Sequence, residues 1–148
     1  GRVFMTAVDC PFRTIERAVA QIRRQDPEAI IIVDIHAEAT SEKMALGHYL
    51  DGKVSAVVGT HTHVQTADNR VLSGGTAYIS DVGMTGPLDS VIGVKKEIVI
   101  ERFISCNAVS ERFESAKGAA QLNAVVIEID ESSYRAISID RIFSIYES

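Results

Sequence analysis

The hydrophobic pattern of the first 60 residues predicts a helix, a strand, a second helix and a second strand, in that order. The first helix is expected over residues 11–25, where Asp9 is a suitable N-cap and Pro11 opens the first turn. Its apolar face consists of residues at helical spacing, which are Ile15, Ala18, Val19 and Ile22. Residues 29–35 are apolar except for Asp34, which is the pattern of a strand buried on both faces.

A second helix is expected after this strand, with Thr40 or Ser41 as its cap. The turn formers Asp51 and Gly52 would end it, and the apolar run at residues 54–58 then predicts another strand. The helix between the two strands is short. Such a unit predicts that the strands pair in parallel through a right-handed crossover.

The second half of the chain changes character. Its expected elements are a strand at residues 76–79, a loop rich in turn formers at 81–87 and a helix at 92–105. Residues 122–130 and 135–142 alternate with a period of two and are joined by a turn, which predicts an antiparallel hairpin. The whole pattern therefore predicts a single α/β domain over residues 1–148, with a mixed sheet and a C-terminal antiparallel hairpin.

Three of the four histidines in the chain follow directly on apolar runs that predict strands. His36 follows the first expected strand, and His61 and His63 follow the second. Ligands of open α/β sheets bind at the carboxyl ends of the strands, so these three imidazoles are expected to meet at one place. In an extended backbone His61 and His63 would also point the same way. The fourth, His48, lies in the second helix and is expected on its surface or in its packing.

These three imidazoles predict part of a metal site. Neutral imidazole binds zinc, manganese, iron and nickel, but no carboxylate follows an equally clear strand end to complete the ligand set. The other ligands are therefore expected outside these residues. Asp34 or Glu38 would orient an imidazole by accepting its second N–H. Glu38 is equally compatible with a direct ligand role and with a solvated position at the entrance of the helix.

Two further features flank the histidines. Thr60 and Thr62 alternate with them and are expected to face the opposite way, against protein. The loop at 81–89 permits two interpretations, because its glycine-rich backbone either approaches a phosphate closely or forms a plain surface turn.

Composition narrows the classes of partner. The net charge of -5 at pH 7 argues against binding double-stranded nucleic acid. No apolar run approaches the roughly 20 residues of a membrane span, so a membrane is not expected as a partner. Cys10 and Cys106 are far apart in the sequence and are expected to be free thiols in a reducing compartment, which favours the cytoplasm. Residues 1–5 resemble a strand entered in mid-chain, so a longer protein is expected.

Three motifs carry a resemblance to a known family. They read DIHAEATSEK at residues 34–43, VVGTHTHVQT at 57–66 and SDVGMTGP at 80–87. They resemble the YmdB-like metallophosphoesterases, bacterial relatives of the calcineurin-like phosphoesterases, and the similarity corresponds to the C-terminal portion of a family member. The resemblance implies a four-layer α/β/β/α sandwich and a dinuclear metal centre, commonly of iron or manganese, with zinc as a further candidate. It also implies phosphodiesterase activity on cyclic nucleotides such as cyclic AMP.

The resemblance also implies roles for individual residues. By motif match, His36 and His61 would hold one metal and His63 the other, and no residue of this chain is assigned as a general acid or base. Family members carry further ligands in an N-terminal half: an Asp, a bridging Glu and an Asn, followed by a His that faces the substrate phosphate. No motif here matches them. We therefore expect this chain to act with a missing N-terminal segment and to be inactive alone, with homo-oligomerisation possible through an exposed sheet edge.

Two alternatives stay open from the sequence. One is a metal-free regulatory or scaffold module whose histidines are remnants. The other is a hydrolase with a single metal in a three-histidine shell, which needs one tetrahedral site and a water. The metal content of the complete protein would separate these alternatives from the dinuclear interpretation.

Overall fold

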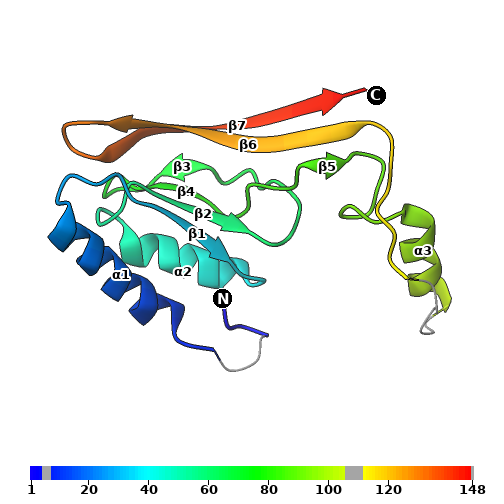
Figure 1. Cartoon of the computed structure of the whole chain (residues 1–148), viewed down its shortest axis with the longest axis horizontal. Helices are drawn as coiled ribbons and strands as arrows, with labels where there is room; N and C mark the ends of the chain where they lie inside the picture. Colours follow the sequence, from blue (N-terminus) through cyan, green and yellow to red (C-terminus); the bar gives the residue numbers. More distant parts are fainter. Residues whose placement is uncertain (5–7, 106–111, 148) are drawn as a thin grey trace.

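The chain forms a mixed α/β fold with two sheets (Figure 1), in a computed structural model that describes residues 1–4, 8–105 and 112–147. The helices are α1 (Pro11–Gln25), α2 (Thr40–Leu50) and α3 (Lys96–Ser105). The strands are β1 (Ile32–His36), β2 (Ala56–Thr60), β3 (Arg70–Val71), β4 (Ala77–Ile79), β5 (Gly86–Pro87), β6 (Ala120–Asp130) and β7 (Arg135–Tyr146). The predicted mixed sheet and C-terminal hairpin are confirmed. The mixed sheet has the order β1-β2-β4-β3 and the antiparallel sheet the order β5-β6-β7.

The first two helices form where the hydrophobic pattern predicts them. Helix α1 begins at Pro11, whose missing N–H costs nothing in a first turn. Its N-cap is Cys10 rather than the expected Asp9. Helix α2 begins at Thr40 with Ala39 as its N-cap, so the expected cap at Thr40 or Ser41 is wrong by one or two residues. In both helices the cap makes no side-chain hydrogen bond, so packing rather than capping fixes where they begin.

The elements stack in three layers (Figure 1). Helices α1 and α2 cover one face of the mixed sheet, where Leu46 and Leu50 pack among buried residues that include Val57. The hairpin of β6 and β7 covers the other face, where Ile139 packs on Ile79. Burial of aliphatic side chains on both faces of the central strands supplies the main stabilisation of such an arrangement.

Strand β1 differs from its prediction, because only one of its faces is buried. Val33 and Ile35 face the helices, whereas Ile32 is 58% exposed and Asp34 is also exposed. The reason is its position: β1 lies at the edge of the mixed sheet, and the hairpin packs over β3 and β4. An apolar run alone cannot reveal which part of a sheet the second layer will cover.

The predicted parallel pairing is confirmed, and it brings the histidine-bearing strand ends together. Strand β2 pairs in parallel with both β1 and β4, and the register places His36 opposite Thr60. Beyond its hydrogen-bonded pairing with β4, strand β2 still runs very close to the backbone that directly follows β4. A Cβ atom added to Gly59 would overlap the carbonyl oxygen of Ser80, so only glycine fits this position.

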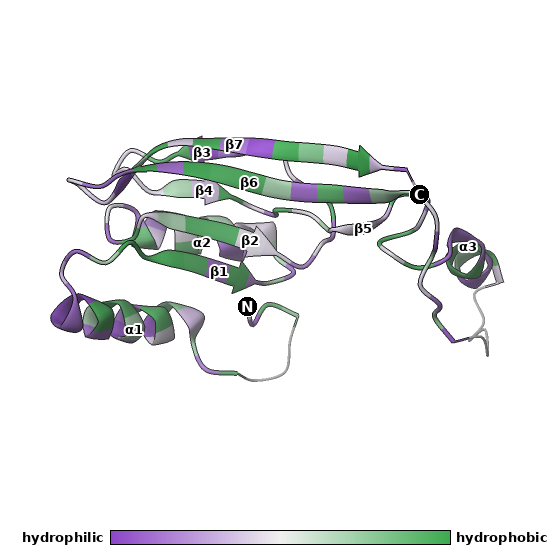
Figure 2. Cartoon of the chain, turned by 45° about the horizontal axis from the view of Figure 1, so that its top comes forward, coloured by the Kyte–Doolittle hydropathy of each residue, from purple (hydrophilic) through white to green (hydrophobic). Residues whose placement is uncertain are grey.

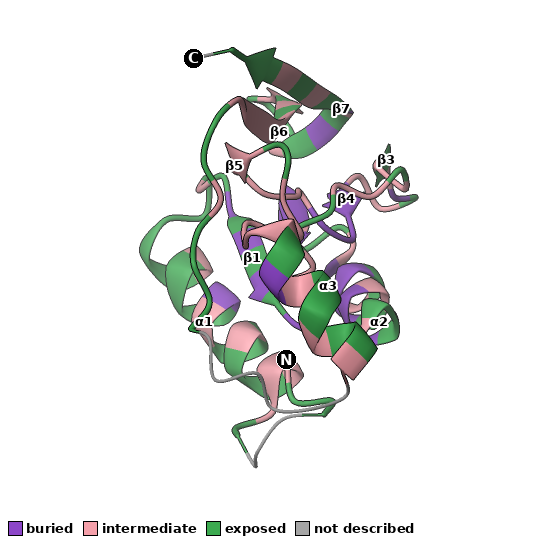
Figure 3. Ribbon diagram, turned by 90° about the vertical axis from the view of Figure 1, so that its right-hand side faces the viewer, coloured by how far each residue is buried: buried purple, intermediate pink, exposed green. Residues whose placement is uncertain are grey.

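Helix α3 is shorter than its prediction and stands apart from the sheets (Figure 1). The expected helix over residues 92–105 begins only at Lys96, because Ile92 and Gly93 adopt positive φ angles of 47° and 99° and form a turn. Ile98 is its buried residue, and the rest of its surface is exposed or half-buried (Figure 3).

Only one of the two cysteines lies within the described residues. Cys10 is a free thiol, as expected, and Cys106 lies outside the described residues. None of the helices that the structure describes has the length and apolar character needed to cross a membrane.

Candidate metal site

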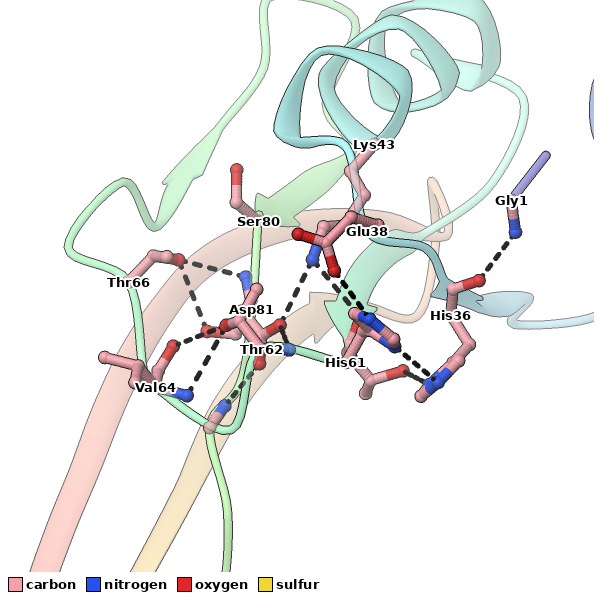
Figure 4. Close-up of polar contacts among 12 residues, drawn as sticks. Gly1, His36, Glu38, Lys43, His61, Thr62, Val64, Thr66, Ser80 and Asp81 are labelled. Carbon is pink, nitrogen blue, oxygen red and sulfur yellow. Dashed lines mark hydrogen bonds and ion pairs between the residues drawn. The ribbon is translucent and has the colours of Figure 1, made fainter. Parts of the chain in front are cut away.

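The structure brings two of the three predicted ligands into contact (Figure 4). His36 is the last residue of β1, and His61 follows β2 directly. Nδ1 of His61 lies 2.9 Å from Nε2 of His36, and the two rings meet edge to face with their centroids 4.8 Å apart. Neither ring is buried. The parallel register of β1 and β2 therefore produces the convergence that the sequence predicts for this pair.

A short chain of hydrogen bonds fixes the proton of His36. The hydroxyl of Thr60 donates to Oδ1 of Asp34 at 2.9 Å, so its oxygen is left to accept from Nδ1 of His36 at 3.0 Å. A neutral imidazole carries one N–H, and here it is on Nδ1. Nε2 of His36 therefore presents a lone pair to His61. Thr60 thus faces the histidines, so the prediction that it points away from them is wrong.

Glu38 fixes the proton of His61 in the same way. Its Oε2 lies 2.7 Å from Nε2 of His61, and an ionised carboxylate only accepts hydrogen bonds, so Nε2 carries the N–H. Nδ1 of a neutral His61 then presents its lone pair to Nε2 of His36 across 2.9 Å. Two lone pairs at this distance repel each other unless the two nitrogens share a proton or both bind a metal ion. In this arrangement Glu38 orients His61 directly and Asp34 orients His36 through Thr60.

His63 has a different partner. Its Nδ1 lies 2.9 Å from the carbonyl oxygen of Ile92, so it donates to that oxygen and leaves Nε2 as the free nitrogen. The φ angles are 122° at His61 and 64° at His63, so this backbone is not extended and the same-side argument for the two rings is wrong. Positive φ at non-glycine residues costs on the order of 1–3 kcal/mol and clusters at functional sites.

Asp81 holds the strained histidine loop in place. Its Oδ2 accepts the backbone N–H of Thr62 at 2.8 Å and its Oδ1 that of Gly83 at 2.9 Å (Figure 4). Lys43 of α2 completes the arrangement with an ion pair of 3.1 Å to Oδ2, in which both side chains are 1% exposed. Burial alone would raise the pKa of Asp81, but the two N–H groups, the Thr62 hydroxyl and Lys43 outweigh it and lower the pKa below its usual value.

The pair of Lys43 and Asp81 was not predicted from the sequence. A signal was present, because Asp81 follows closely on the strand that became β4 and is therefore a carboxylate at a strand end. Lys43 also donates to the carbonyl oxygen of Thr60 at 3.2 Å. A buried lysine needs such partners, since an unpaired charge in the interior is strongly unfavourable. The pair therefore ties α2 to the ends of β2 and β4, beside the histidines.

The described residues supply only a partial ligand set. Within residues 1–4, 8–105 and 112–147, no group of three or more His, Cys, Asp and Glu side chains is placed to hold a metal ion. Nε2 of His36 and Nδ1 of His61 face each other at 2.9 Å, and His63 presents its Nε2 separately. The assignment of these three histidines as metal ligands stays a prediction. His48 is exposed on α2, as expected.

Comparisons with known proteins identify the family of this chain and solved structures that share its fold. The model of the YmdB-like protein family matches residues 1–142, and the chain therefore belongs to this family. The chain is 52% identical over 142 residues to the 2′,3′-cyclic-nucleotide 2′-phosphodiesterase of Bacillus subtilis (strain 168). That alignment covers 96% of this chain and 52% of the relative.

Two solved structures share the fold. A hypothetical protein from Thermus thermophilus superimposes with a TM-score of 0.86 at 42% identity, over 100% of this chain and 55% of that one. A novel phosphatase from Mycoplasma pneumoniae superimposes with a TM-score of 0.84 at 39% identity, over 97% of this chain and 49% of that one. The chain thus spans about half the length of the proteins it matches.

Proposed function

We propose that this chain supplies histidine ligands to a dinuclear metal centre that hydrolyses the phosphodiester of cyclic nucleotides. The observation that carries the proposal is the pair of ring nitrogens, Nε2 of His36 and Nδ1 of His61, which face each other at 2.9 Å. Their outer nitrogens are already committed to Thr60 and Glu38. A metal ion held by both rings would take both lone pairs, while Thr60 and Glu38 would keep the outer nitrogens.

The donor set suits a first-row transition metal. Neutral imidazole binds iron, manganese and zinc, and partners on the outer ring nitrogen typically strengthen such ligands. In the proposal His36 and His61 hold one ion, and Nε2 of His63 serves the second. Fe or Mn are the favoured metals and Zn a further candidate. The pair and the single nitrogen fit part of this centre, and the remaining ligands would come from a segment outside residues 1–148.

The chemistry follows from the positions of these residues. Bound metal ions in such centres polarise the phosphoryl oxygens and lower the pKa of water. The chain's own contribution is to hold the ligands: Glu38 and Thr60 set the ring tautomers, and Asp81 holds the loop that carries His61 and His63. None of these residues is assigned as the general acid that protonates the leaving sugar oxygen. We place that group in the further segment.

The substrate class is inferred from the relatives. The name of the Bacillus subtilis relative specifies 2′,3′-cyclic nucleotides, and the Mycoplasma pneumoniae structure is named a phosphatase. A cyclic nucleotide phosphodiester agrees with the name of the Bacillus subtilis relative and is a suitable substrate for the predicted metal centre. Cyclic AMP is the candidate that the family resemblance implies. The free thiol of Cys10 is consistent with a cytoplasmic location, which forms part of the same proposal.

The whole protein is proposed to be a four-layer α/β/β/α sandwich. Helices, mixed sheet and hairpin give three layers, and apolar residues on the hairpin are uncovered: Val126 is 54% exposed and Ile137 is 58% exposed. A further segment of the length seen in the relatives would supply the fourth layer of helices. It would also supply the absent ligands. Association with a second copy is a further candidate for covering exposed edges.

Metal analysis of the full-length protein tests the proposal. We expect about two metal ions per chain after purification without chelators, and loss of metal and of 2′,3′-cyclic AMP hydrolysis in His36→Ala and His61→Ala. His48→Ala, an exposed histidine on α2, is the matched control and is expected to keep both. Unchanged metal content in the His36 and His61 variants would refute the assignment.

The same measurement separates the alternatives. One ion per chain would favour the single-metal hydrolase with three histidines. Absence of metal would favour the scaffold module, because a proton shared by His36 and His61 explains their 2.9 Å contact equally well.

A further inference from the structure

A cavity of about 450 Å³ opens beside the candidate metal site. Its volume is within the range of about 300–1,000 Å³ typical of small-molecule sites. His63 forms part of its wall, together with side chains from the loop after β4 and from the hairpin. The lining residues used below are Val64, Met84, Ile92, Asn123, Arg141 and Phe143. Met84 belongs to the loop at 81–89, so this loop forms a pocket wall rather than a plain surface turn.

One face of the hairpin changes its chemistry where it reaches this cavity. Directly opposed residues of antiparallel strands share a face, so the pair of Asn123 and Phe143 lies on the same face as the pair of Ile127 and Ile139. Ile127 and Ile139 pack on the mixed sheet. Farther toward β5 the same face carries the amide of Asn123, the guanidinium of Arg141 and the aromatic ring of Phe143. Along β6, Figure 2 shows a continuous apolar stretch followed by alternating polar and apolar residues toward β5.

The groups that line the cavity suit a flat, polar-edged ring. Phe143 is 56% exposed, and aromatic rings of this kind stack on nucleobases. Nδ2 of Asn123 donates to the carbonyl oxygen of Met84 at 2.7 Å, which fixes the amide and leaves Oδ1 as an acceptor. Arg141 donates one N–H to the carbonyl oxygen of Thr66 over a long distance of 3.4 Å. Its other N–H groups are therefore available for a ligand.

The position of His63 connects this cavity to the proposed chemistry. Its Nδ1 is held by Ile92, another wall residue, and its Nε2 is the nitrogen proposed for the second metal. Val64 and Ile92 are 60% and 53% exposed and supply apolar wall beside it. A phosphodiester bound near His63 therefore has an adjacent space for the group that it carries.

We propose that this cavity binds the nucleoside part of the cyclic nucleotide, with Phe143 stacking on the base and Arg141 and Asn123 contacting polar groups of the base or ribose. The inference rests on the proposed phosphodiesterase function and adds the residues that select a nucleotide over a simpler cyclic phosphodiester.

The test compares two substrates on the full-length protein. 2′,3′-Cyclic AMP carries a nucleoside, whereas glycerol 1,2-cyclic phosphate has a five-membered cyclic phosphodiester without a base. In the unaltered protein we expect kcat/KM to be higher for 2′,3′-cyclic AMP than for glycerol 1,2-cyclic phosphate. In Phe143→Leu and Arg141→Gln we expect this preference to fall about tenfold, chiefly through KM for the nucleotide, because stacking or a charged hydrogen bond is lost.

Matched controls carry the same changes at exposed positions that do not line the cavity. Phe103→Leu on α3 and Arg17→Gln on α1 are expected to keep the preference of the unaltered protein. The inference is overturned if the unaltered protein shows no preference, or if the Phe143 and Arg141 variants lose activity on both substrates equally. Either result leaves the phosphodiesterase proposal standing. If the metal-loaded unaltered protein hydrolyses neither substrate, the proposed function itself fails.

Discussion

At the scale of single residues, hydrogen-bond partners decide which nitrogen of a histidine is free to bind a metal ion. Thr60 performs this role for His36, because its hydroxyl oxygen accepts from Nδ1 while its proton goes to Asp34. In Thr60→Val this acceptor is lost and Nε2 is no longer preselected. We expect metal affinity of the full-length protein to fall about 10- to 100-fold, the usual effect of removing such a partner. Competition with a chelator measures the change.

Thr62→Val provides the control for this prediction. The hydroxyl of Thr62 contacts the Val64 backbone and helps to lower the pKa of Asp81, but it does not contact His36. The backbone N–H that Asp81 accepts at 2.8 Å is kept by valine, so the loop anchor remains. We expect this variant to bind metal almost as the unaltered protein does. Equal affinity in the Thr60 and Thr62 variants would show that the tautomer of His36 does not limit binding.

Asp68 gives the fold a dependence on pH. Burial alone would raise the pKa of Asp68, but hydrogen bonds from Ser80 and Thr66 outweigh burial and lower it below the ordinary 3.8. A carboxyl group whose pKa is lowered by folding stabilises the fold at pH values above its ordinary pKa. That contribution is lost as the pH falls from about 4 through the lowered pKa.

The pH prediction is tested by urea unfolding of the full-length protein between pH 7 and pH 3. We expect the free energy of unfolding to fall less steeply below about pH 4 in Asp68→Asn than in the unaltered protein. Glu131→Gln, an exposed carboxylate in the turn after β6, is the control and is expected to leave the slope unchanged. A slope in the Asp68 variant that matches the unaltered protein would contradict the role of this group.

Single residues also show where sequence reasoning ends. The contact of His36 with His61 was predictable, because both follow strands that pair in parallel. The ion pair of Lys43 with Asp81 joins residues 38 positions apart and depends on how α2 packs against the sheet. The orientation of Thr60 was not predictable from alternation, since the backbone at His61 has a positive φ angle and breaks the period of two.

At the scale of elements, helix α2 approaches β4 so closely that one position requires glycine. A Cβ atom at Gly47 would lie 2.6 Å from Cδ2 of the Tyr78 ring, which is itself 1% exposed. We expect Gly47→Ala to lower the free energy of unfolding by about 1–3 kcal/mol through overpacking, although alanine is the better helix former. Chemical denaturation of the full-length protein measures this change.

His48→Ala, at the neighbouring exposed position of α2, is the comparison. It changes a surface residue and is expected to alter stability by about 0.5 kcal/mol or less. If Gly47→Ala instead stabilises the protein, the close packing of α2 on Tyr78 is not maintained in solution.

The type and order of the principal elements follow from the sequence, but their surroundings do not. Periodicity predicted α1 within its observed bounds and the hairpin at nearly its full extent, because both depend on local alternation of apolar residues. It could not predict that β1 has an open face, since that depends on where the hairpin packs. It also placed the start of α3 too early, because the turn at Ile92 keeps apolar residues next to the helix.

At the scale of the whole molecule, the outer face of the hairpin tests the proposed fourth layer. Val126 is 54% exposed in this chain and would be buried in the four-layer arrangement. We expect Val126→Asp to lower the free energy of unfolding of the full-length protein by about 2 kcal/mol, because it places a carboxylate in an apolar contact.

The isolated chain is the control for this prediction. There the side chain faces solvent, so the same substitution is expected to change its stability by about 0.5 kcal/mol or less. Equal effects in the two proteins, measured by urea unfolding, would show that no further layer covers this face.

The glycine of the Gly-Thr-His-Thr-His segment is required by packing and not by catalysis. Any side chain at Gly59 would collide with the main chain at Ser80, whereas His61 is half-buried and His63 is exposed. Selection for the proposed metal binding and selection for a foldable backbone would therefore act on different residues of this short segment. A relative that no longer bound metal would be free to lose the histidines but would still need the glycine. A sequence search that relied on the glycine alone would therefore find inactive relatives together with enzymes.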